Sequence, residues 1–134
     1  MLGTLLILLV PVADVVHFIT DMLFASKVRE AAKHVGVTIQ GVRDPQALAA
    51  AARDAKLVIV DLRVPRALEA LDALAGDAAA RAVPSVAFID HERTDLMDEA
   101  RARGAGQVMA KGQFANALPK LLQAAVGPLP PAAA

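Results

Sequence analysis

A carboxylate at the end of an apolar run is the group best placed for chemistry in this 134-residue sequence. Asp61 follows the segment 57–60 (LVIV), and a continuous apolar run of this kind is typical of a parallel strand covered by helices on both faces. Because a charge within such a strand is costly, we place Asp61 at its carboxyl end, the edge at which open α/β sheets bind ligands. Asp61 is therefore either part of a functional site or a carboxylate that only caps a helix or bonds a loop.

Two further charged residues also follow predicted strands. Asp21 comes after the β-branched and aromatic segment 15–20, and Lys111 comes after the segment 107–110. Because the carboxyl ends of parallel strands meet at one edge of a sheet, we expect both side chains to lie near Asp61. Carboxylate oxygens bind Mg²⁺, and a lysine ammonium binds anionic oxygens. The structural alternatives are that Asp21 only caps the next helix and that Lys111 only pairs with Asp61.

The elements that must position these residues alternate regularly along the chain. Five segments of strand composition are each followed by a segment with apolar residues at helical spacing. This alternation predicts an α/β fold with a doubly wound parallel sheet and three α/β/α layers. The flavodoxin-like (βα)5 arrangement with strand order 2-1-3-4-5 is favoured, and it brings the ends of the first and third strands together. The predicted strands are 15–20, 37–42, 57–62, 85–89 and 107–110.

Several helix boundaries depend on single residues. Asp44, which precedes a proline, predicts a helix start, and Pro65 is expected to open the next helix. The segment 77–82 is expected to be a polar and Ala-rich connection between two elements. Asn116 is expected to cap the last helix, with Pro119 in its first turn, where a missing N–H does no harm.

The two ends of the chain differ from the rest in composition. We expect one domain over residues 14–126, between a hydrophobic extension at 1–13 and a Pro/Ala tail at 127–134. The extension is shorter than the about 20 apolar residues of a membrane span, and no basic residue precedes it as in a signal peptide. An added strand, a weak membrane anchor and upstream sequence read from an early start are open alternatives. We favour a packed or partly ordered extension of a cytoplasmic protein.

Charge and residue content exclude several classes of partner. The 14 basic and 14 acidic residues cancel, so no basic surface for nucleic acid is expected. All four aromatic residues are Phe, which leaves few platforms on which single-stranded bases could stack. Cysteine is absent, and His17, His34 and His91 lack the spacing of metal ligands.

Three segments together resemble a response-regulator receiver domain of the CheY-like type. They are LVIVDL, which contains Asp61, VPSVAFI at 83–89 and GAGQVMAK at 104–111. The resemblance implies that Asp61 accepts a phosphoryl group, that Asp21 and Asp61 bind Mg²⁺, and that Lys111 contacts phosphoryl oxygens. It also implies that the chain is not an enzyme beyond this receipt of a phosphoryl group.

The sequence departs from the family pattern at the other positions of this site. The acidic pair after the first strand is Thr20-Asp21, and the Ser or Thr at the end of the fourth strand is Ile89, followed by Asp90 and His91. Ile89 has no hydroxyl to bind a phosphoryl oxygen, and a glycine replaces the proline that usually follows the lysine. The sequence therefore resembles a divergent or pseudo-receiver and, without an output domain, a single-domain one.

Three functions are consistent with these features. The first is a signalling module of two-component signal transduction that acts by protein–protein interaction, with weak or no phosphotransfer. The second is a working receiver of a phosphorelay, phosphorylated on Asp61 with Mg²⁺. The third is a flavodoxin-like small-molecule binder, which a lack of phosphate-cradling glycines and hydroxyls after the first strand disfavours.

The resemblance also implies an interaction face on the family's fourth helix, fifth strand and fifth helix. In this sequence the face includes Met97, Glu99, Arg103 and Gln107. Mixed charges around a flexible methionine suit a modest, reversible interface with a signalling protein or a second copy of the chain. The alternative is an ordinary solvated helix face.

Overall fold

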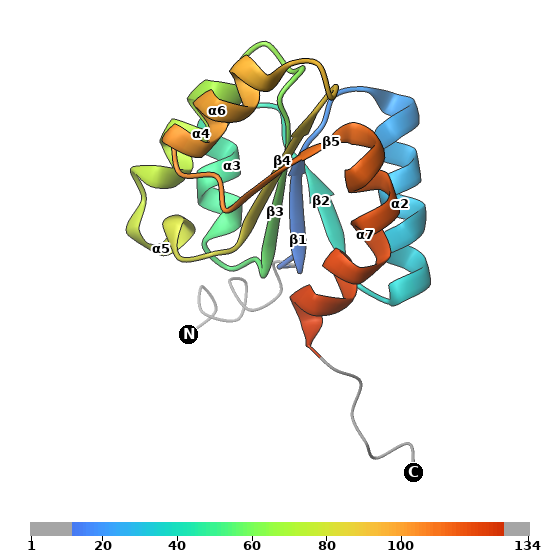
Figure 1. The fold of residues 1–134 in the computed structure, drawn as a ribbon. Helices are drawn as coiled ribbons and strands as arrows, with labels where there is room; N and C mark the ends of the chain where they lie inside the picture. The colour runs from blue at the N-terminus through green and yellow to red at the C-terminus, as the bar shows by residue number, and fades with distance from the viewer. Residues whose placement is uncertain (1–11, 128–134) are drawn as a thin grey trace, which may run out of the picture.

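Five parallel strands form one sheet in a computed structural model that describes residues 12–127 (Figure 1). The strand order β2-β1-β3-β4-β5 confirms the predicted flavodoxin-like arrangement. The last two strands have the predicted bounds, and the first three are shorter than predicted. The strands are β1 (Val15–Phe18), β2 (Ile39–Gly41), β3 (Leu57–Asp61), β4 (Ser85–Ile89) and β5 (Gln107–Ala110).

Helices cover both faces of the sheet and complete the three predicted layers. On one face α2 (Met22–Val35) and α7 (Lys111–Val126) lie side by side (Figure 1). The opposite face carries α3 (Pro45–Ala52), α4 (Ala67–Ala75), α5 (Ala78–Arg81) and α6 (Thr94–Ala102).

Strand β3 lies at the centre of the sheet and sends alternate side chains into two cores. Val60 packs in the core under α3 and α4 with Leu71, and Ile59 packs in the core under α2 and α7 with Phe114. Burial of a side chain as large as Ile59 stabilises the fold by about 1.5–3 kcal/mol. Helices on both faces thus explain why this strand is apolar at successive positions and why its one charge, Asp61, comes at the end.

Aspartate side chains cap three of the helices, α2, α3 and α5. Asp44 accepts hydrogen bonds from two backbone N–H groups of α3, at 3.0 and 3.1 Å, which confirms the predicted cap. Asp77 accepts two such bonds in the same way and begins α5, a four-residue helix that lies within the predicted connection at 77–82. Helix α4 begins at Ala67, two residues after the proline expected to open it.

Helix α7 begins at Lys111, directly after β5, so the prediction that Asn116 caps it is wrong. Pro119 lies inside this helix and not in its first turn. Pro119 has no N–H to donate to the Ala115 carbonyl, but both residues are exposed, so water can bond this carbonyl instead. Buried residues on the opposite side, including Leu118, hold the helix against the sheet despite the missing bond.

The ends of the chain fall largely outside the described residues. The extension predicted at 1–13 is described only at its last two residues, and the tail at 127–134 only at its first. The division into a domain over 14–126 and two flanking segments therefore stays a prediction. No helix within residues 12–127 is long and apolar enough to cross a membrane.

Candidate functional site

Asp61 lies at the carboxyl end of β3, and Arg63 holds both of its side-chain oxygens. The residue is 1% exposed and is aligned with Phe88 of β4. The Arg63 guanidinium donates from Nε to Oδ1 at 3.1 Å and from Nη2 to Oδ2 at 2.9 Å. The Arg63 backbone N–H adds a bond of 2.9 Å to Oδ1. This two-bond arrangement is the strong geometry of arginine with a carboxylate, so one neighbouring residue satisfies the buried charge.

Asp21 follows β1 and lies near the same guanidinium nitrogen as Asp61. Its Oδ2 is 3.7 Å from Nη2 of Arg63. Its Oδ1 accepts a bond of 3.1 Å from the Phe24 N–H, which confirms that Asp21 caps α2. That backbone bond, together with the weaker pull of Arg63 and Lys111, lowers the pKa of the Asp21 carboxyl. Asp21 is thus both a helix cap and a second carboxylate beside Arg63.

Arg63 is the residue that the sequence analysis missed. Its hydrogen bond to Asp61, with the charges of Asp21 and Asp90 nearby, raises the pKa of the guanidinium further. The only sequence signal is an arginine two positions after the strand-ending aspartate. This spacing places both residues in the same turn, but the spacing does not say where the arginine side chain points.

The chain after β4 offers no hydroxyl to the site. Ile89 is 2% exposed and packs in the core under α3 and α4. Asp90 and His91 are exposed, and His91 lies 4.0 Å from its neighbour Glu92. Thr20 is also exposed, one residue before Asp21. Residues 89–91 therefore offer a buried aliphatic side chain and exposed charged or polar groups, without a hydroxyl.

Lys111 lies over an aromatic ring rather than beside a carboxylate. Its Nζ is 4.9 Å from the centroid of the Phe24 ring, a cation–π distance. Phe24 belongs to a cluster with Phe88 and Phe114, whose rings are stacked 4.4 Å apart. Within residues 12–127, no carboxylate oxygen lies within 4.0 Å of Lys111 Nζ. The ion-pair partner of Asp61 is thus Arg63, and a contact between Lys111 and a phosphoryl group stays a prediction.

The arrangement does not fit Mg²⁺ as it stands. Asp21 and Asp61 are the oxygen ligands that the sequence offers, but the Arg63 guanidinium already occupies the position between them. The described part of the chain contains no group of three or more acidic or histidine side chains that could hold a metal. A hard cation needs oxygen ligands whose lone pairs are not already bonded, so Mg²⁺ and Arg63 would compete for Asp61.

The residues of the expected interaction face are partly used within the chain. Arg103, the residue that follows α6, pairs with Asp72 of α4, and its Nη2 lies 3.6 Å from Oε1 of Glu99 on α6. Met97 of α6 is half-buried and packs against the core under α3 and α4. Gln107 is exposed at the start of β5. The charges on this face therefore join α6 to α4, which leaves fewer of them for a partner.

Comparison with known proteins identifies the fold. No protein-family model matches the sequence, and no curated protein sequence matches it either. Among solved structures, CheY4 of Vibrio cholerae, a chemotaxis response regulator, aligns with a TM-score of 0.70 and 20% identity over 86% of this chain and 99% of its own. A response-regulator receiver domain from Rhodospirillum rubrum aligns with a TM-score of 0.66 and 21% identity, over 87% of this chain and 96% of its own.

A third similar structure is the receiver domain of the sensor histidine kinase PA1611 from Pseudomonas aeruginosa, with a magnesium ion coordinated in its active-site cleft. It aligns with a TM-score of 0.69 and 15% identity, over 84% of this chain and 96% of its own. Structural similarity at sequence identities this low establishes the fold alone, so the chemistry must be judged from the residues described above. The chain therefore has the CheY-like fold of response-regulator receiver domains.

Proposed function

We propose that this chain is a receiver-fold signalling module that acts by binding a protein partner, with weak or no phosphotransfer. The observation that carries the proposal is the two-bond pair between Arg63 and the buried Asp61. In this proposal Arg63 supplies the positive charge that a receiver would obtain from a bound cation. The chain catalyses no turnover of its own.

The pair acts against phosphotransfer in two ways. A carboxylate that attacks phosphorus must present an unbonded oxygen, and both oxygens of Asp61 are bonded to Arg63. Breaking a buried ion pair costs about 3–5 kcal/mol, and the lower value applies here because the Arg63 side chain is 30% exposed. A barrier raised by about 3 kcal/mol slows a reaction roughly a hundredfold.

The residue at the end of β4 gives a second argument, because Ile89 cannot transmit a change at Asp61 to the adjoining loop. A hydroxyl at the end of β4 could follow a new phosphoryl group and carry a shift into the adjoining loop. Ile89 is buried and aliphatic, so its side chain cannot form a hydrogen bond with a phosphoryl group on Asp61. A ligand or modification shifts an equilibrium only through interactions that differ between the two states, so partner binding should not depend on a phosphodonor.

The proposal is tested by intact-mass measurement after incubation with acetyl phosphate and Mg²⁺. We expect no phosphoryl adduct on the wild-type chain and an adduct on the Arg63→Ala variant. Arg66→Ala is the matched control, because Arg66 lies in the same loop region and pairs with Glu69 instead of Asp61. A wild-type adduct located on Asp61 would overturn the proposal, and an unmodified Arg63→Ala variant would show that Arg63 is not the blocking group.

A further inference from the structure

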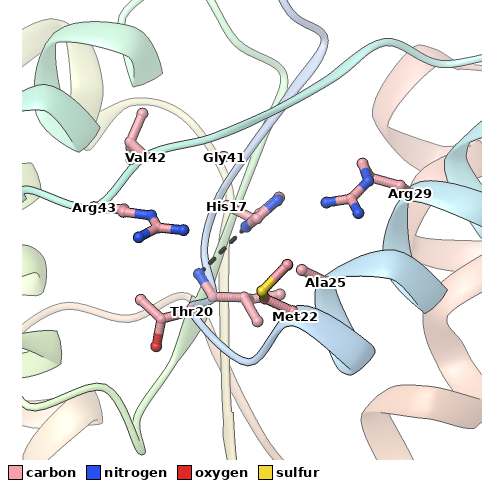
Figure 2. A pocket seen from close by; sticks show the side chains of 9 residues that line it. His17, Thr20, Met22, Ala25, Arg29, Gly41, Val42 and Arg43 are labelled. Atoms are coloured by element: carbon pink, nitrogen blue, oxygen red, sulfur yellow. Dashed lines mark hydrogen bonds between the residues drawn. The ribbon is translucent and has the colours of Figure 1, made fainter.

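A cavity lies at the carboxyl edge of the sheet, beside the ends of β1 and β2, and none of Asp61, Arg63 and Lys111 lines it. Its volume is about 270 Å³. His17 of β1 lies between Arg29 of α2 and Arg43, which follows β2, and both guanidinium groups point toward the imidazole (Figure 2). The cavity thus brings together His17, Arg29 and Arg43 from a strand, a helix and the connection after β2.

His17 is the buried polar group of this cavity. The residue is 4% exposed, and its Nδ1 accepts a bond of 3.3 Å from the Ile19 N–H. Burial, and then the charge of Arg29, lower the pKa of His17 to about 4, so the ring is neutral near pH 7. Because Nδ1 accepts, the proton of the neutral ring is on Nε2. Within residues 12–127 this Nε2–H makes no hydrogen bond, and the ring lines the cavity, so the donor is available to a ligand.

The two arginines differ from most others in the chain. Within the described residues, no carboxylate oxygen lies within 4.0 Å of the Arg29 or Arg43 guanidinium. Two cations that face one cavity without a counter-ion attract an anion there. By contrast, each of the following arginines has a carboxylate partner: Arg53, Arg63, Arg66, Arg93, Arg101 and Arg103.

Gly41 allows the imidazole of His17 to lie close against the backbone of β2. A Cβ at this position would lie 2.7 Å from Cε1 and 2.8 Å from Nε2 of His17, distances that real Cβ atoms do not show. Glycine is therefore required by the close approach of the ring. The ring and Gly41 both line the cavity, and Gly41 has no side chain that would fill it.

We propose that this cavity binds a small organic phosphomonoester through Arg29, Arg43 and the Nε2–H of His17. A phosphomonoester is dianionic near pH 7, which matches two guanidinium charges, and its oxygens accept bonds from guanidinium and imidazole N–H groups. Thr20 also lines the cavity, with its hydroxyl directed away from His17 (Figure 2). The volume equals that of about nine water molecules, which leaves room for an organic group beside the phosphate.

The test is an NMR titration of the ¹⁵N-labelled chain with phenyl phosphate, inorganic phosphate and succinate. We expect phenyl phosphate to shift the amide signals of Thr20, Gly41 and Arg43, with inorganic phosphate weaker at the same residues and succinate weakest. Arg29→Gln and Arg43→Gln should each raise Kd at least about tenfold, the effect of losing one charge-assisted bond. Both side chains are exposed, so neither variant should unfold the chain.

Lys33→Gln is the matched control, because Lys33 is an exposed cation on the same helix and does not line the cavity. We expect its Kd to stay within about twofold of the wild-type value. Three results would overturn the proposal: no shift at the cavity residues with millimolar phenyl phosphate, unchanged affinity in the two arginine variants, or tighter binding of succinate. The last result would assign the cavity to carboxylates.

Discussion

Arg63 donates two hydrogen bonds to Asp61 from only two residues along the chain, Nε to Oδ1 at 3.1 Å and Nη2 to Oδ2 at 2.9 Å. The acceptor is almost fully buried at the end of the central strand, whereas the donor is partly exposed. Displacement of Arg63 would therefore leave a carboxylate with little access to water and with a single remaining backbone bond. This relationship governs both the stability and the chemistry expected at the edge of the sheet.

A double-mutant cycle on this pair should give a clear coupling free energy. We expect Asp61→Ala and Arg63→Ala to couple by about 1–3 kcal/mol in urea unfolding, a value reduced for the partial exposure of Arg63. The exposed pair of Arg66 and Glu69 is the control, with an expected coupling of about 0.5 kcal/mol or less. Equal coupling energies for the two pairs would contradict the role given to burial.

Removal of the guanidinium should make the two carboxylates available to Mg²⁺. In NMR titrations with MgCl₂ we expect the amide signals of Asp21 and Asp61 to shift in the Arg63→Ala variant and to stay unchanged in the wild type. Two carboxylates without a neighbouring cation attract a hard cation, whereas Arg63 already neutralises them. Arg66→Ala should behave as the wild type. Wild-type shifts at millimolar Mg²⁺ would show that the ion displaces Arg63.

Stability should fall on mild acidification because of His17. Its pKa is lowered from 6.5 to about 4 in the folded chain, so between these values the unfolded chain binds a proton that the folded chain does not. The contribution of His17 to the free energy of unfolding is complete above pH 6.5 and is lost as the pH falls toward 4. The expected loss is about 2 kcal/mol between pH 7 and pH 5.

The measurement is urea unfolding at both pH values. His17→Gln should flatten this pH dependence, while His34→Gln, at an exposed position, should retain it. The lowered pKa of the Asp21 carboxyl affects stability only at lower pH, since its contribution is present above its ordinary value of 3.8 and is lost as the pH falls below it. A pH dependence that survives in His17→Gln would contradict the assignment to His17.

Gly41→Ala should destabilise the chain and displace the imidazole. The added methyl would lie 2.7 Å from the His17 ring, and forced overpacking of this kind costs about 1–3 kcal/mol. Gly112→Ala is the control, because nothing lies within 4 Å of its Cβ position inside α7, and alanine there should be neutral or stabilising by about 0.5–1 kcal/mol. A Gly41→Ala chain as stable as the wild type would show that the ring can move away.

Partner binding or self-association should depend on the face formed by α6, β5 and α7. We expect Glu99→Lys to weaken it in sedimentation velocity or pull-down, with or without a phosphodonor. The single change is preferable to one at Arg103, because Arg103 also joins α6 to Asp72 of α4. Glu30→Lys is the control, since Glu30 is exposed on α2 and likewise lies near a basic residue one turn on. Equal effects of both changes would argue against this face.

The sequence by itself determined the sheet and the position of its central carboxylate. Strand and helix periods are local, and parallel connections allow few topologies, so the order of the five strands could be predicted. Asp61 could be placed at the end of β3 because a charge is not tolerated within a strand buried on both faces. For the same local reason the caps at Asp21 and Asp44 could be predicted.

Only the tertiary structure decided which side chains meet at the edge of the sheet. A long side chain in a loop has many rotamers, so the sequence could not say that Arg63 rather than Lys111 would reach Asp61. Lys111 is the first residue of α7, directly after β5, and its Nζ lies over the Phe24 ring. The buried residues of α7 set the start of this helix, whereas Asn116 and Pro119 had predicted a later one. The cavity likewise depends on three segments that are distant in sequence, and their approach is set by strand pairing and not by any local pattern.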